Sequence, residues 1–286
     1  MKKTRYSNVL GVIGDPVYHS LSPVMHNAAI RALKIDYIYV ACHVKPSILP
    51  RVIGRISSMG IAGVNVTIPH KERVIELLDE ISEQSARIGS VNTIVNIDGR
   101  LRGETTDGPG FMRSVTEQWG KLDGCKALVI GAGGSAKAIA FSLAEIGCEV
   151  VIANRTRERA VELVEGLREV YKAGRFRVAD LNENVIGDEI RATDLMVNTT
   201  SVGMHPDTDS IPVPPEYLHP HLLVYDLIYN PARTRLIEEA ERRGARALGG
   251  LKMLVYQGAL SLEMWTGLQP PIAVMEEAVV EALKTR

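Results

Sequence analysis

The sequence predicts an α/β fold of two domains, and three observations support this prediction. Short β-branched runs alternate with amphipathic stretches along the chain, the rhythm of a sheet covered by helices on both faces. The chain has 286 residues, and domains usually contain about 100–200 residues. Hydrophobic residues make up 45% and charged residues 23% of the chain, as in an ordinary globular protein.

The first half of the chain carries one series of elements. Apolar runs predict strands at 9–14, 37–44, 63–68 and 91–97, and the stretches between them predict helices at 22–33, 46–58 and 70–80. Ser22 followed by Pro23 predicts a helix start with a hydroxyl N-cap, and Pro69 predicts another helix start. Asp98-Gly99, between two extended runs, predicts a two-residue hairpin.

A second series begins near residue 126. It predicts strands at 127–131, 149–153, 176–180, 195–199, 222–226 and 245–248, with helices at 134–146, 157–172 and 233–243. The proline-rich segment 205–221 lacks periodicity and predicts a loop, whereas 250–284 predicts two helices. The boundary between the two series falls around 108–124, where a predicted helix gives way to a turn.

Composition excludes several classes of protein. The 33 Lys and Arg against 34 Asp and Glu give a net charge of −1, which argues against a nucleic-acid partner. The most apolar region, 138–153, is interrupted by two glutamates and a glycine, so we expect no membrane span, and no signal-peptide core follows the basic start. Three widely spaced cysteines are not a disulfide framework, so we expect a reduced, cytoplasmic chain. No metal-ligand motif occurs among the histidines and cysteines, so we expect no metal.

The segment GAGGSA (131–136) has the context of a dinucleotide site, because it follows an apolar strand and opens a helix of small residues. Gly131, Gly133 and Ala136 fill the three positions of the G-x-G-x-x-G/A pattern. The first glycine allows a tight turn, the second lets the backbone approach a pyrophosphate, and the small third residue lets helix and strand pack closely. The amides at the helix start then favour phosphate.

The end of the next strand indicates which nucleotide is bound. An NAD site normally has an Asp or Glu there for the ribose 2′-hydroxyl. This chain instead has Asn154, Arg155 and Thr156, followed by Arg157 and Arg159. A planar guanidinium suits a 2′-phosphate, which a carboxylate would repel. We therefore expect NADP(H), although a solvated helix start would also explain the arginines.

A nicotinamide enzyme that oxidises an alcohol also needs a group to accept the hydroxyl proton. Polar residues cluster at three strand ends or loops of the first half: Ser20 and Ser22 in HSLSP, Thr67 and Lys71 in NVTIPHK, and Asn92 in SVNT with Asp107 in TTDG. Taken singly, each has a structural explanation, such as a helix cap for Ser22 or Asp107 and solvation for Lys71.

As an ordered set, these motifs resemble the shikimate dehydrogenase family over nearly the whole length, from GVIGDPVYHSLSP to GGLKMLVYQG. The resemblance implies that Lys71 is the catalytic base and Asp107 its partner. It implies substrate contacts at Ser20, Ser22, Thr67, Asn92, Asp107, Tyr229 and Gln257. It implies cofactor contacts at Glu83, Gly131, Ala132, Gly133, Gly134, Ser135, Ala136, Asn154, Arg155, Thr156, Arg159, Thr200, Ser201, Leu227, Gly250 and Met253.

The implied reaction is the reversible NADPH-dependent reduction of 3-dehydroshikimate to shikimate. The resemblance also implies a substrate domain of residues 1–108 plus 251–286 and a Rossmann-type NADP-binding domain of residues 109–250. The tail helices would pack back on the first domain, because Gln257 must reach the substrate. A monomer and a homodimer both stay open.

Two alternatives remain at this point. One is a quinate/shikimate dehydrogenase of broader substrate or NAD use, which the absence of an acid at the strand end disfavours. The other is an NADP-binding redox sensor without catalysis, which would keep GAGGSA but have no need for Lys71 and Asp107.

Overall fold

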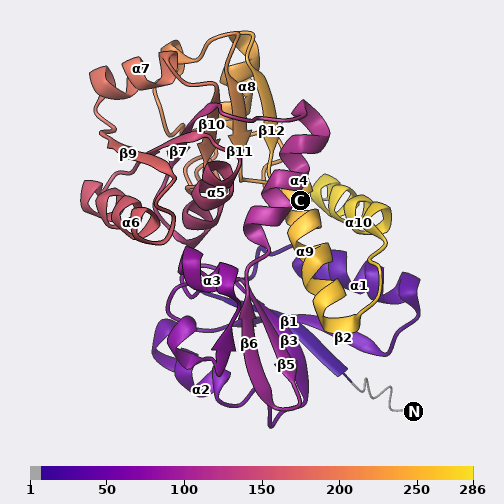
Figure 1. The fold of residues 1–286 in the computed structure, drawn as a ribbon. Coiled ribbons are helices and arrows are strands. Elements are labelled where there is room, and N and C mark those ends of the chain that lie inside the picture. The colour runs from indigo at the N-terminus through magenta and orange to yellow at the C-terminus, as the bar shows by residue number, and fades with distance from the viewer. Residues whose placement is uncertain (1–7, 286) are drawn as a thin grey trace. The chain divides into compact units, whose positions relative to one another are not determined.

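The computed structural model describes residues 8–285, apart from the side chains of residues 183 and 184. The chain divides into two compact units, here called unit 1 and unit 2. Unit 1 takes the described residues up to Gly110 and from Val255 onward, and unit 2 takes Phe111–Leu254. Figure 1 shows that each unit consists of a sheet with helices packed against it.

Unit 1 contains a mixed sheet of six strands in the order β2-β1-β3-β5-β6-β4. The strands are β1 (Asn8–Gly14), β2 (Tyr37–His43), β3 (Ile61–Val66), β4 (Glu80–Ile81), β5 (Thr93–Ile97) and β6 (Arg100–Glu104). Strands β2, β1 and β3 are parallel, and β5 runs antiparallel to both β3 and β6. The predicted hairpin joins β5 to β6, and Asp98 and Gly99 both have positive φ, as a tight hairpin turn of this kind requires.

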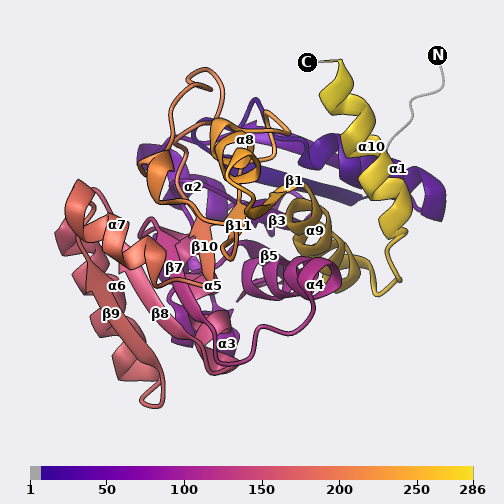
Figure 2. The ribbon, with the colours of Figure 1, turned by 90° about the horizontal axis from the view of Figure 1, so that it is seen from above.

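Six α-helices lie in unit 1 or extend into it: α1 (Ser22–Leu33), α2 (Leu49–Ile53), α3 (Glu83–Ile88), α4 (Asp107–Trp119), α9 (Leu251–Thr266) and α10 (Ile272–Lys284). Figures 1 and 2 both show α10 beside α1, and these two helices share an extensive contact. Gly258 of α9 packs so closely on α1 that a Cβ at this position would collide with Met25. The C-terminal helices therefore pack back on the N-terminal sheet, as predicted.

Several local predictions for unit 1 are wrong. Residues 70–80 form turns and a short 3-10 helix (Ile75–Leu77) rather than an α-helix. The reason is that β4, which begins at Glu80, pairs with β6 at the edge of the sheet. The helix predicted over 46–58 ends at Ile53. Helix α3 was not predicted. Leu21, not Ser22, is the N-cap of α1, and no side chain caps that helix.

Unit 2 contains six parallel strands in the order β12-β11-β10-β7-β8-β9. They are β7 (Lys126–Ile130), β8 (Glu149–Ala153), β9 (Arg175–Ala179), β10 (Leu195–Asn198), β11 (Leu223–Asp226) and β12 (Arg246–Gly249). The chain starts in the middle at β7, builds outward to β9, then returns to β10 and builds the other half. This is the doubly wound Rossmann order, in which ligands bind where the order reverses, here beside β7 and β10.

The helices of unit 2 are α5 (Gly134–Glu145), α6 (Arg157–Val170), α7 (Glu183–Arg191) and α8 (Arg235–Arg242). Helix α4 (Asp107–Trp119) begins in unit 1 and continues into unit 2, and α9 also contributes residues to both. The strands follow the predicted runs to within one or two residues. Helix α7 was not predicted, and the predicted loop 205–221 contains a short 3-10 helix, Pro215–Tyr217.

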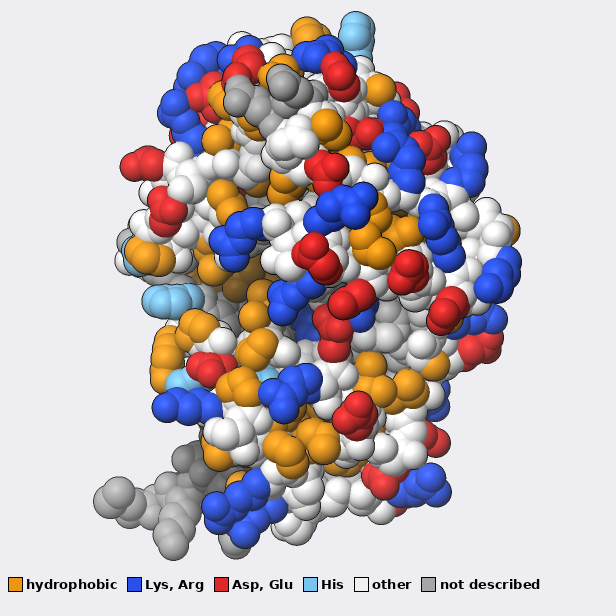
Figure 3. Space-filling model, turned by 90° about the vertical axis from the view of Figure 1, so that its left-hand side faces the viewer, with side chains coloured by type: hydrophobic (Ala, Val, Ile, Leu, Met, Phe, Trp, Pro, Cys, Tyr) orange, Lys and Arg blue, Asp and Glu red, His pale blue; other side chains and the backbone are white. Residues whose placement is uncertain are grey.

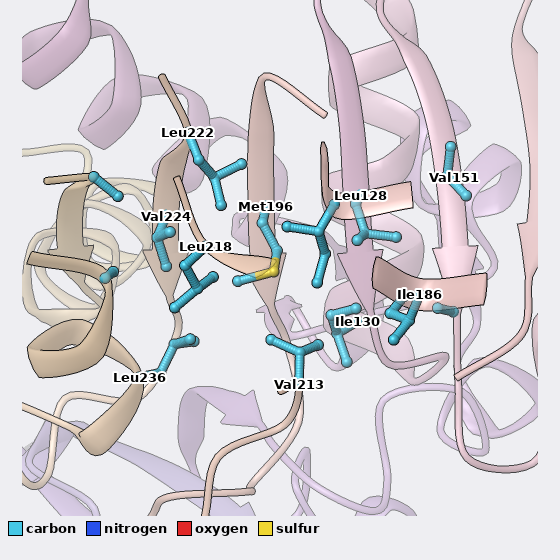
Figure 4. Packing of buried hydrophobic residues seen from close by; sticks show 14 of the residues in the cluster. Leu128, Ile130, Val151, Ile186, Met196, Val213, Leu218, Leu222, Val224 and Leu236 are labelled. Atoms are coloured by element: carbon cyan, nitrogen blue, oxygen red, sulfur yellow. The ribbon is translucent and has the colours of Figure 1, made fainter. Parts of the chain in front are cut away.

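One core cluster of unit 2 covers a single face of its sheet. Figure 4 shows Met196 of β10 between Leu218 and Leu128, with Val213 below them near Ile130. All five side chains are at most 4% exposed. Because a parallel sheet is covered on both faces, its strands read as continuous apolar runs, which is why these strands were readable from the sequence.

The surface carries charges of both signs, intermixed over the face shown in Figure 3. Within residues 8–285, no helix is long and apolar enough to cross a membrane.

Candidate active site

The polar centre of unit 1 is an ion pair between Lys71 and Asp107. Lys71 lies in the turns after β3, and Asp107 is the first residue of α4. Lys71 Nζ lies 2.5 Å from Asp107 Oδ2, and the two side chains are 12% and 6% exposed. The other carboxylate oxygen, Oδ1, accepts a hydrogen bond of 2.9 Å from Asn92 Nδ2. The carboxylate is therefore held from one side and pairs with the lysine on the other.

Asn92 joins several predicted site residues. Its Nδ2 also donates to Thr106 Oγ1 at 2.8 Å and to Gln257 Oε1 at 3.3 Å, while its Oδ1 accepts from the Thr106 backbone amide at 2.7 Å. Asn92 itself is 2% exposed. The structure thus brings Lys71, Asn92, Asp107 and Gln257 together, although they come from four separate parts of the sequence.

A buried polar network lies behind this cluster, and the sequence analysis missed it. Tyr39 OH donates to Asn65 Oδ1 at 2.7 Å, and Asn65 Nδ2 donates to Ser261 Oγ at 2.9 Å. Ser261 Oγ lies 2.8 Å from Thr93 Oγ1, next to Asn92 in the chain. All four side chains are at most 5% exposed. The sequence signal was a polar residue in otherwise apolar elements, namely Asn65 within GVNV and Ser261 within ALSL.

Ser20 and Ser22 lie together at the start of α1. The Ser22 backbone amide donates to Ser20 Oγ at 3.2 Å. One turn later, His26 places Nδ1 2.9 Å from the Ser22 carbonyl and Nε2 3.1 Å from the Gly258 carbonyl. Complete burial lowers the pKa of His26 to about 4. The ring stacks on Tyr39 with centroids 4.1 Å apart. The segment from Ser20 to Ser22, here called the serine loop, is therefore followed by a buried ring that lies within hydrogen-bond distance of carbonyls on both α1 and α9.

A second anchor of the serine loop was not predicted either. Tyr18 OH lies 2.5 Å from His43 Nδ1, and His43 Nε2 lies 2.5 Å from Asp15 Oδ1. These contacts connect the loop after β1 to the end of β2. Thr67 lies near the same loop, since its backbone amide donates to the Ile13 carbonyl at 2.9 Å and a Cβ on Gly14 would collide with its methyl group.

The glycine loop of unit 2 lies at the carboxyl end of β7, beside β10. Gly131 has φ +117°, and a Cβ there would collide with Thr199 Oγ1, so the turn requires glycine. Gly133 is the N-cap of α5, and a Cβ built on it would meet no atom within 4 Å. Ala136 is fully buried against the sheet. The half-buried loop residues Ala132, Gly134 and Ser135 flank the exposed Gly133 and complete a helix start of the kind that binds phosphate.

The arginines after β8 differ in whether their guanidinium groups are already paired with the protein. Arg157 Nε pairs with Asp180 Oδ1 at 2.7 Å. Within residues 8–285, the exposed side chains of Arg155 and Arg159 make no hydrogen bond or ion pair with the protein. Asn154 Nδ2 donates to the Thr156 carbonyl at 2.8 Å, which folds this turn. Two guanidinium groups are therefore available for an anion, and the intermediate arginine is not.

The loops after β10 and β11 are held by one buried pair. Asn198 Oδ1 accepts from the Thr200 backbone amide at 3.0 Å and from Thr200 Oγ1 at 2.7 Å. Asp226 Oδ1 accepts from Asn198 Nδ2 at 3.0 Å and from the Ile228 amide at 3.1 Å, next to Leu227. Burial raises the pKa of Asp226 to about 6, against the opposing effect of its hydrogen bonds. The sequence analysis missed both residues, although each ends an apolar strand.

The remaining predicted contacts lie in varied surroundings. Gly250 packs against the backbone of Leu227 so tightly that a Cβ would collide with the Leu227 carbonyl. Met253 is 6% exposed, Tyr229 is half-buried, and Ser201 is exposed. Glu83 belongs to unit 1, is 80% exposed and pairs with Arg87 along α3. It is thus separated by unit from the other predicted cofactor contacts.

A metal centre finds no support in the geometry. Across the described part of the chain, no group of three or more His, Cys, Asp or Glu side chains is arranged to hold a metal ion.

The fold and the two sets of polar residues define a two-domain α/β protein of the dinucleotide-binding class. Family models match residues 12–94 (Shikimate dehydrogenase substrate binding domain), 113–203 (Shikimate / quinate 5-dehydrogenase) and 250–280 (Shikimate 5'-dehydrogenase C-terminal domain). The chain belongs to the shikimate dehydrogenase family.

Individual relatives cover nearly the whole chain. A shikimate dehydrogenase (NADP(+)) from Methanopyrus kandleri is 48% identical over 282 residues, which cover 97% of each chain. A crystal structure of a shikimate dehydrogenase in complex with NADP+ has a TM-score of 0.90 at 40% identity, covering 97% of this chain and 96% of the other. A shikimate 5-dehydrogenase from Listeria monocytogenes in complex with shikimate and NAD has a TM-score of 0.87 at 35% identity, covering 97% and 98%.

Proposed function

We propose that this chain is an NADP-dependent shikimate dehydrogenase that catalyses the reversible reduction of 3-dehydroshikimate to shikimate. The observation that carries the proposal is the Lys71–Asp107 ion pair, held by Asn92 and largely withdrawn from solvent in unit 1. A purely structural ion pair in this position would gain little from its burial, because desolvation of two charges offsets much of their attraction. A proton-transfer role explains why a lysine stands there.

The substrate is a small anionic polyol, and unit 1 supplies side chains to match it. Ser20 and Ser22 provide hydroxyl donors for its carboxylate, and they lie together at one helix start. Thr67, Asn92 and Gln257 provide groups that pair with ring hydroxyls, with Tyr229 as a further contact from unit 2. An analogue lacking a paired hydroxyl would leave a buried polar group unsatisfied, at a cost of about 1–3 kcal/mol.

Lys71 moves the proton in the proposed mechanism. In the reduction direction, its ammonium donates a proton to the substrate oxygen as the carbonyl becomes a hydroxyl. In the oxidation direction, the neutral amine accepts that proton. Asp107 orients the ammonium through its Oδ2, while Asn92 fixes the carboxylate through its Oδ1.

Bound NADPH supplies the hydride to the substrate carbonyl carbon, and the residues of unit 2 fit this cofactor. Open space at Gly133 lets the backbone of the loop approach a pyrophosphate, and the N-terminus of α5 favours its charge. Among residues 8–285, the side chains of Arg155 and Arg159 have no competing partner, and these two arginines would hold the 2′-phosphate. Thr156, Thr200, Ser201, Leu227, Gly250 and Met253 would form the rest of the contact, with Glu83 a further contact from unit 1.

NAD use and quinate use form the main alternative. The Listeria relative was crystallised with NAD, so a fold of this kind accommodates either nucleotide. Arg155 and Arg159 favour NADP here, because NAD lacks the 2′-phosphate with which they would pair. Quinate differs from shikimate mainly by one hydroxyl and by ring saturation, which the polar side chains of unit 1 would have to discriminate. A non-catalytic redox sensor would leave the Lys71–Asp107 pair without a role.

We also propose a cytoplasmic location and a monomer or homodimer. The balanced charge and sparse cysteines support the first, and cell fractionation tests it. Analytical ultracentrifugation distinguishes the two oligomeric states.

One assay tests the proposed reaction. The purified chain is given shikimate or quinate with NADP or NAD, and nicotinamide reduction is followed by absorbance. The proposal expects the highest kcat/KM with shikimate and NADP. Equal kcat/KM with NAD would remove the assigned role of Arg155 and Arg159, a preference for quinate would move the chain to the alternative, and binding of NADPH without turnover of either substrate would favour the sensor.

A further inference from the structure

Two cysteines meet at the end of the unit 2 sheet where strands β7 and β8 begin, opposite the glycine loop. Cys125 directly precedes β7, and Cys148 directly precedes β8. Their Sγ atoms lie 2.9 Å apart, and both are free thiols. Cys148 is 1% exposed, whereas Cys125 is half-buried. Cys125 is therefore the cysteine that solvent can reach, and Cys148 is buried next to it.

Sheet register, and not chance proximity, brings the two cysteines together. Strands β7 and β8 pair in parallel with Lys126 opposite Glu149, so each cysteine is one residue before the matched pair. The Glu149 amide donates to the Cys125 carbonyl at 2.9 Å, which extends the ladder past both cysteines. Neighbouring strands are about 4.8 Å apart, within the range of about 4.4–6.8 Å that the Cα atoms of a disulfide usually span.

Each cysteine also follows a glycine in the left-handed region. Gly124 has φ +73° and Gly147 has φ +82°. The chain therefore enters β7 and β8 through the same Gly-Cys turn, which orients both side chains alike. Cys148 Sγ additionally contacts the Leu122 carbonyl at 3.2 Å, which holds the inner sulfur in place.

We propose that Cys125 and Cys148 are a site of oxidative modification, at which peroxide converts the two thiols into a disulfide that stabilises unit 2. The cross-link would enclose β7, the glycine loop and α5, and would join the two strand starts at the end of the sheet away from the cofactor contacts. It is independent of the proposed dehydrogenase activity.

The chemistry balances with hydrogen peroxide as the oxidant. The sulfur of Cys125, the more exposed of the two, attacks one peroxide oxygen, the O–O bond breaks, and a sulfenic acid and one water form. The sulfur of Cys148 then attacks the sulfur of Cys125, the S–O bond breaks, and a second water leaves as the S–S bond forms. Hydrogen bonding between the two thiols raises the pKa of Cys125 and lowers the pKa of Cys148. Exposure therefore assigns the first step to Cys125, and the lowered pKa suits the Cys148 thiol to the second step.

The expected gain is in stability, not in activity. Cross-linking a loop of about 24 residues restricts the unfolded chain, and together with the dependence of Tm on chain size this predicts a rise in Tm of roughly 5–10 °C. The glycine loop begins six residues after Cys125, at the other end of β7, so oxidation should leave kcat and the KM for NADP within about twofold.

The test treats the intact wild-type protein with peroxide under native conditions and compares it with the protein reduced by dithiothreitol. Expected are the loss of two titratable thiols, retention of the Cys42 thiol, a disulfide-linked peptide pair containing residues 125 and 148 by mass spectrometry, and the higher Tm. Cys42→Ala should behave like wild type, whereas Cys125→Ser should keep the lower Tm after peroxide. Because the mapping uses wild type, a variant that fails to fold does not obscure the result.

Three results would overturn the proposal: three titratable thiols after peroxide, sulfinic acid at Cys125 without a linked peptide, or a linked protein whose Tm does not rise. A linked and stabilised protein that has lost NADP binding would contradict the separation from the cofactor contacts. Absence of dehydrogenase activity in the reduced protein would bear only on the proposed function.

Discussion

Asn198 donates a hydrogen bond of 3.0 Å to Asp226 across the ends of β10 and β11, with both side chains fully buried. Each residue then accepts bonds from the loop that follows its own strand: Thr200 on one side, and Ile228 on the other. Thr234 Oγ1 completes the set with a bond of 2.6 Å to Asp226 Oδ2. Two loops with proposed cofactor contacts therefore share one buried support.

Asn198→Ala tests this support. The variant should lose about 1–3 kcal/mol of unfolding free energy, because Asp226 and the Thr200 amide lose buried partners. The KM for NADP should rise by roughly 3–10-fold, equivalent to about 1 kcal/mol of lost positioning, while kcat changes less. The matched control is Asn182→Ala, which removes the N-cap of α7 elsewhere in unit 2 and costs stability without changing the KM. A wild-type KM in Asn198→Ala would show that the loops after β10 and β11 do not need Asn198 to keep their positions.

Lys71→Ala should reduce kcat by roughly 100-fold or more, the usual scale for losing an acid–base group. The Kd for NADPH should stay the same, because Lys71 and its ion-pair partner Asp107 both belong to unit 1. Steady-state kinetics and fluorescence titration with NADPH measure the two quantities. Lys121→Ala, at an exposed lysine in the turn after α4, serves as the control and should match wild type. Near-normal turnover in Lys71→Ala would exclude Lys71 as the proton donor.

Arg155→Ala should lower kcat/KM for NADP by roughly 10–100-fold, since a hydrogen bond to a charged group contributes about 1.5–3 kcal/mol. The kcat/KM for NAD should change little, so the ratio of kcat/KM for NADP to kcat/KM for NAD should fall. Arg157→Ala is the matched control, because that guanidinium is already paired with Asp180. If the two variants lost the same factor with NADP, the availability of Arg155 would not explain cofactor choice.

Acid should weaken unit 1 more than unit 2. The pKa of His26 is lowered to about 4 in the folded state, so the unfolded chain binds more protons below pH 6.5. Stability of unit 1 then falls as the pH drops from about 6.5 to about 4, by about 3 kcal/mol in total. The pKa of Asp226 is raised to about 6, so the folded state of unit 2 binds more protons. Protonation of Asp226 therefore increases the free energy of unfolding of unit 2 as the pH falls from about 6 to about 4, which is opposite to the effect of His26 on unit 1.

Native-state hydrogen exchange at pH 7 and pH 5 measures this difference on the intact chain. Slowly exchanging amides of α1 and β1 should lose protection relative to those of β7 and β10, after correction for the intrinsic pH dependence of exchange. His26→Gln should remove the acid sensitivity of unit 1 even if it lowers stability overall. Parallel losses in both units, in wild type and in the variant, would contradict the assignment.

The strands of unit 2 could be predicted from the sequence because they are buried on both faces and read as apolar runs. The helix predicted over 70–80 failed for the converse reason. Val74, Ile75 and Leu77 are spaced as on a helix face, yet they pack into the core of unit 1 from turns, since the following residues pair with β6. Sheet-edge pairing depends on residues distant in sequence, and no local period reports it.

The site shows the same division. Lys71, Asn92 and Asp107 were readable because each stands in a short motif. Asn65, Ser261 and Asn198 were not, because their roles depend on contacts with residues between 26 and 196 positions away. Ser22 was assigned a capping role that the structure gives to no side chain. Motifs thus identified the groups proposed to meet the substrate, and only the fold identified the groups that hold them.

His26 has one further consequence. Its two ring nitrogens face two carbonyl oxygens, Ser22 O within its own helix and Gly258 O on α9. A neutral imidazole carries a single N–H, so it donates to only one of them at a time. In the Nε2–H tautomer the ring ties α1 to α9, and in the Nδ1–H tautomer it bonds within α1 alone. The position of one hydrogen atom therefore decides whether the serine loop is tethered to the helix that carries Gln257, and ¹⁵N chemical shifts of the ring report it directly.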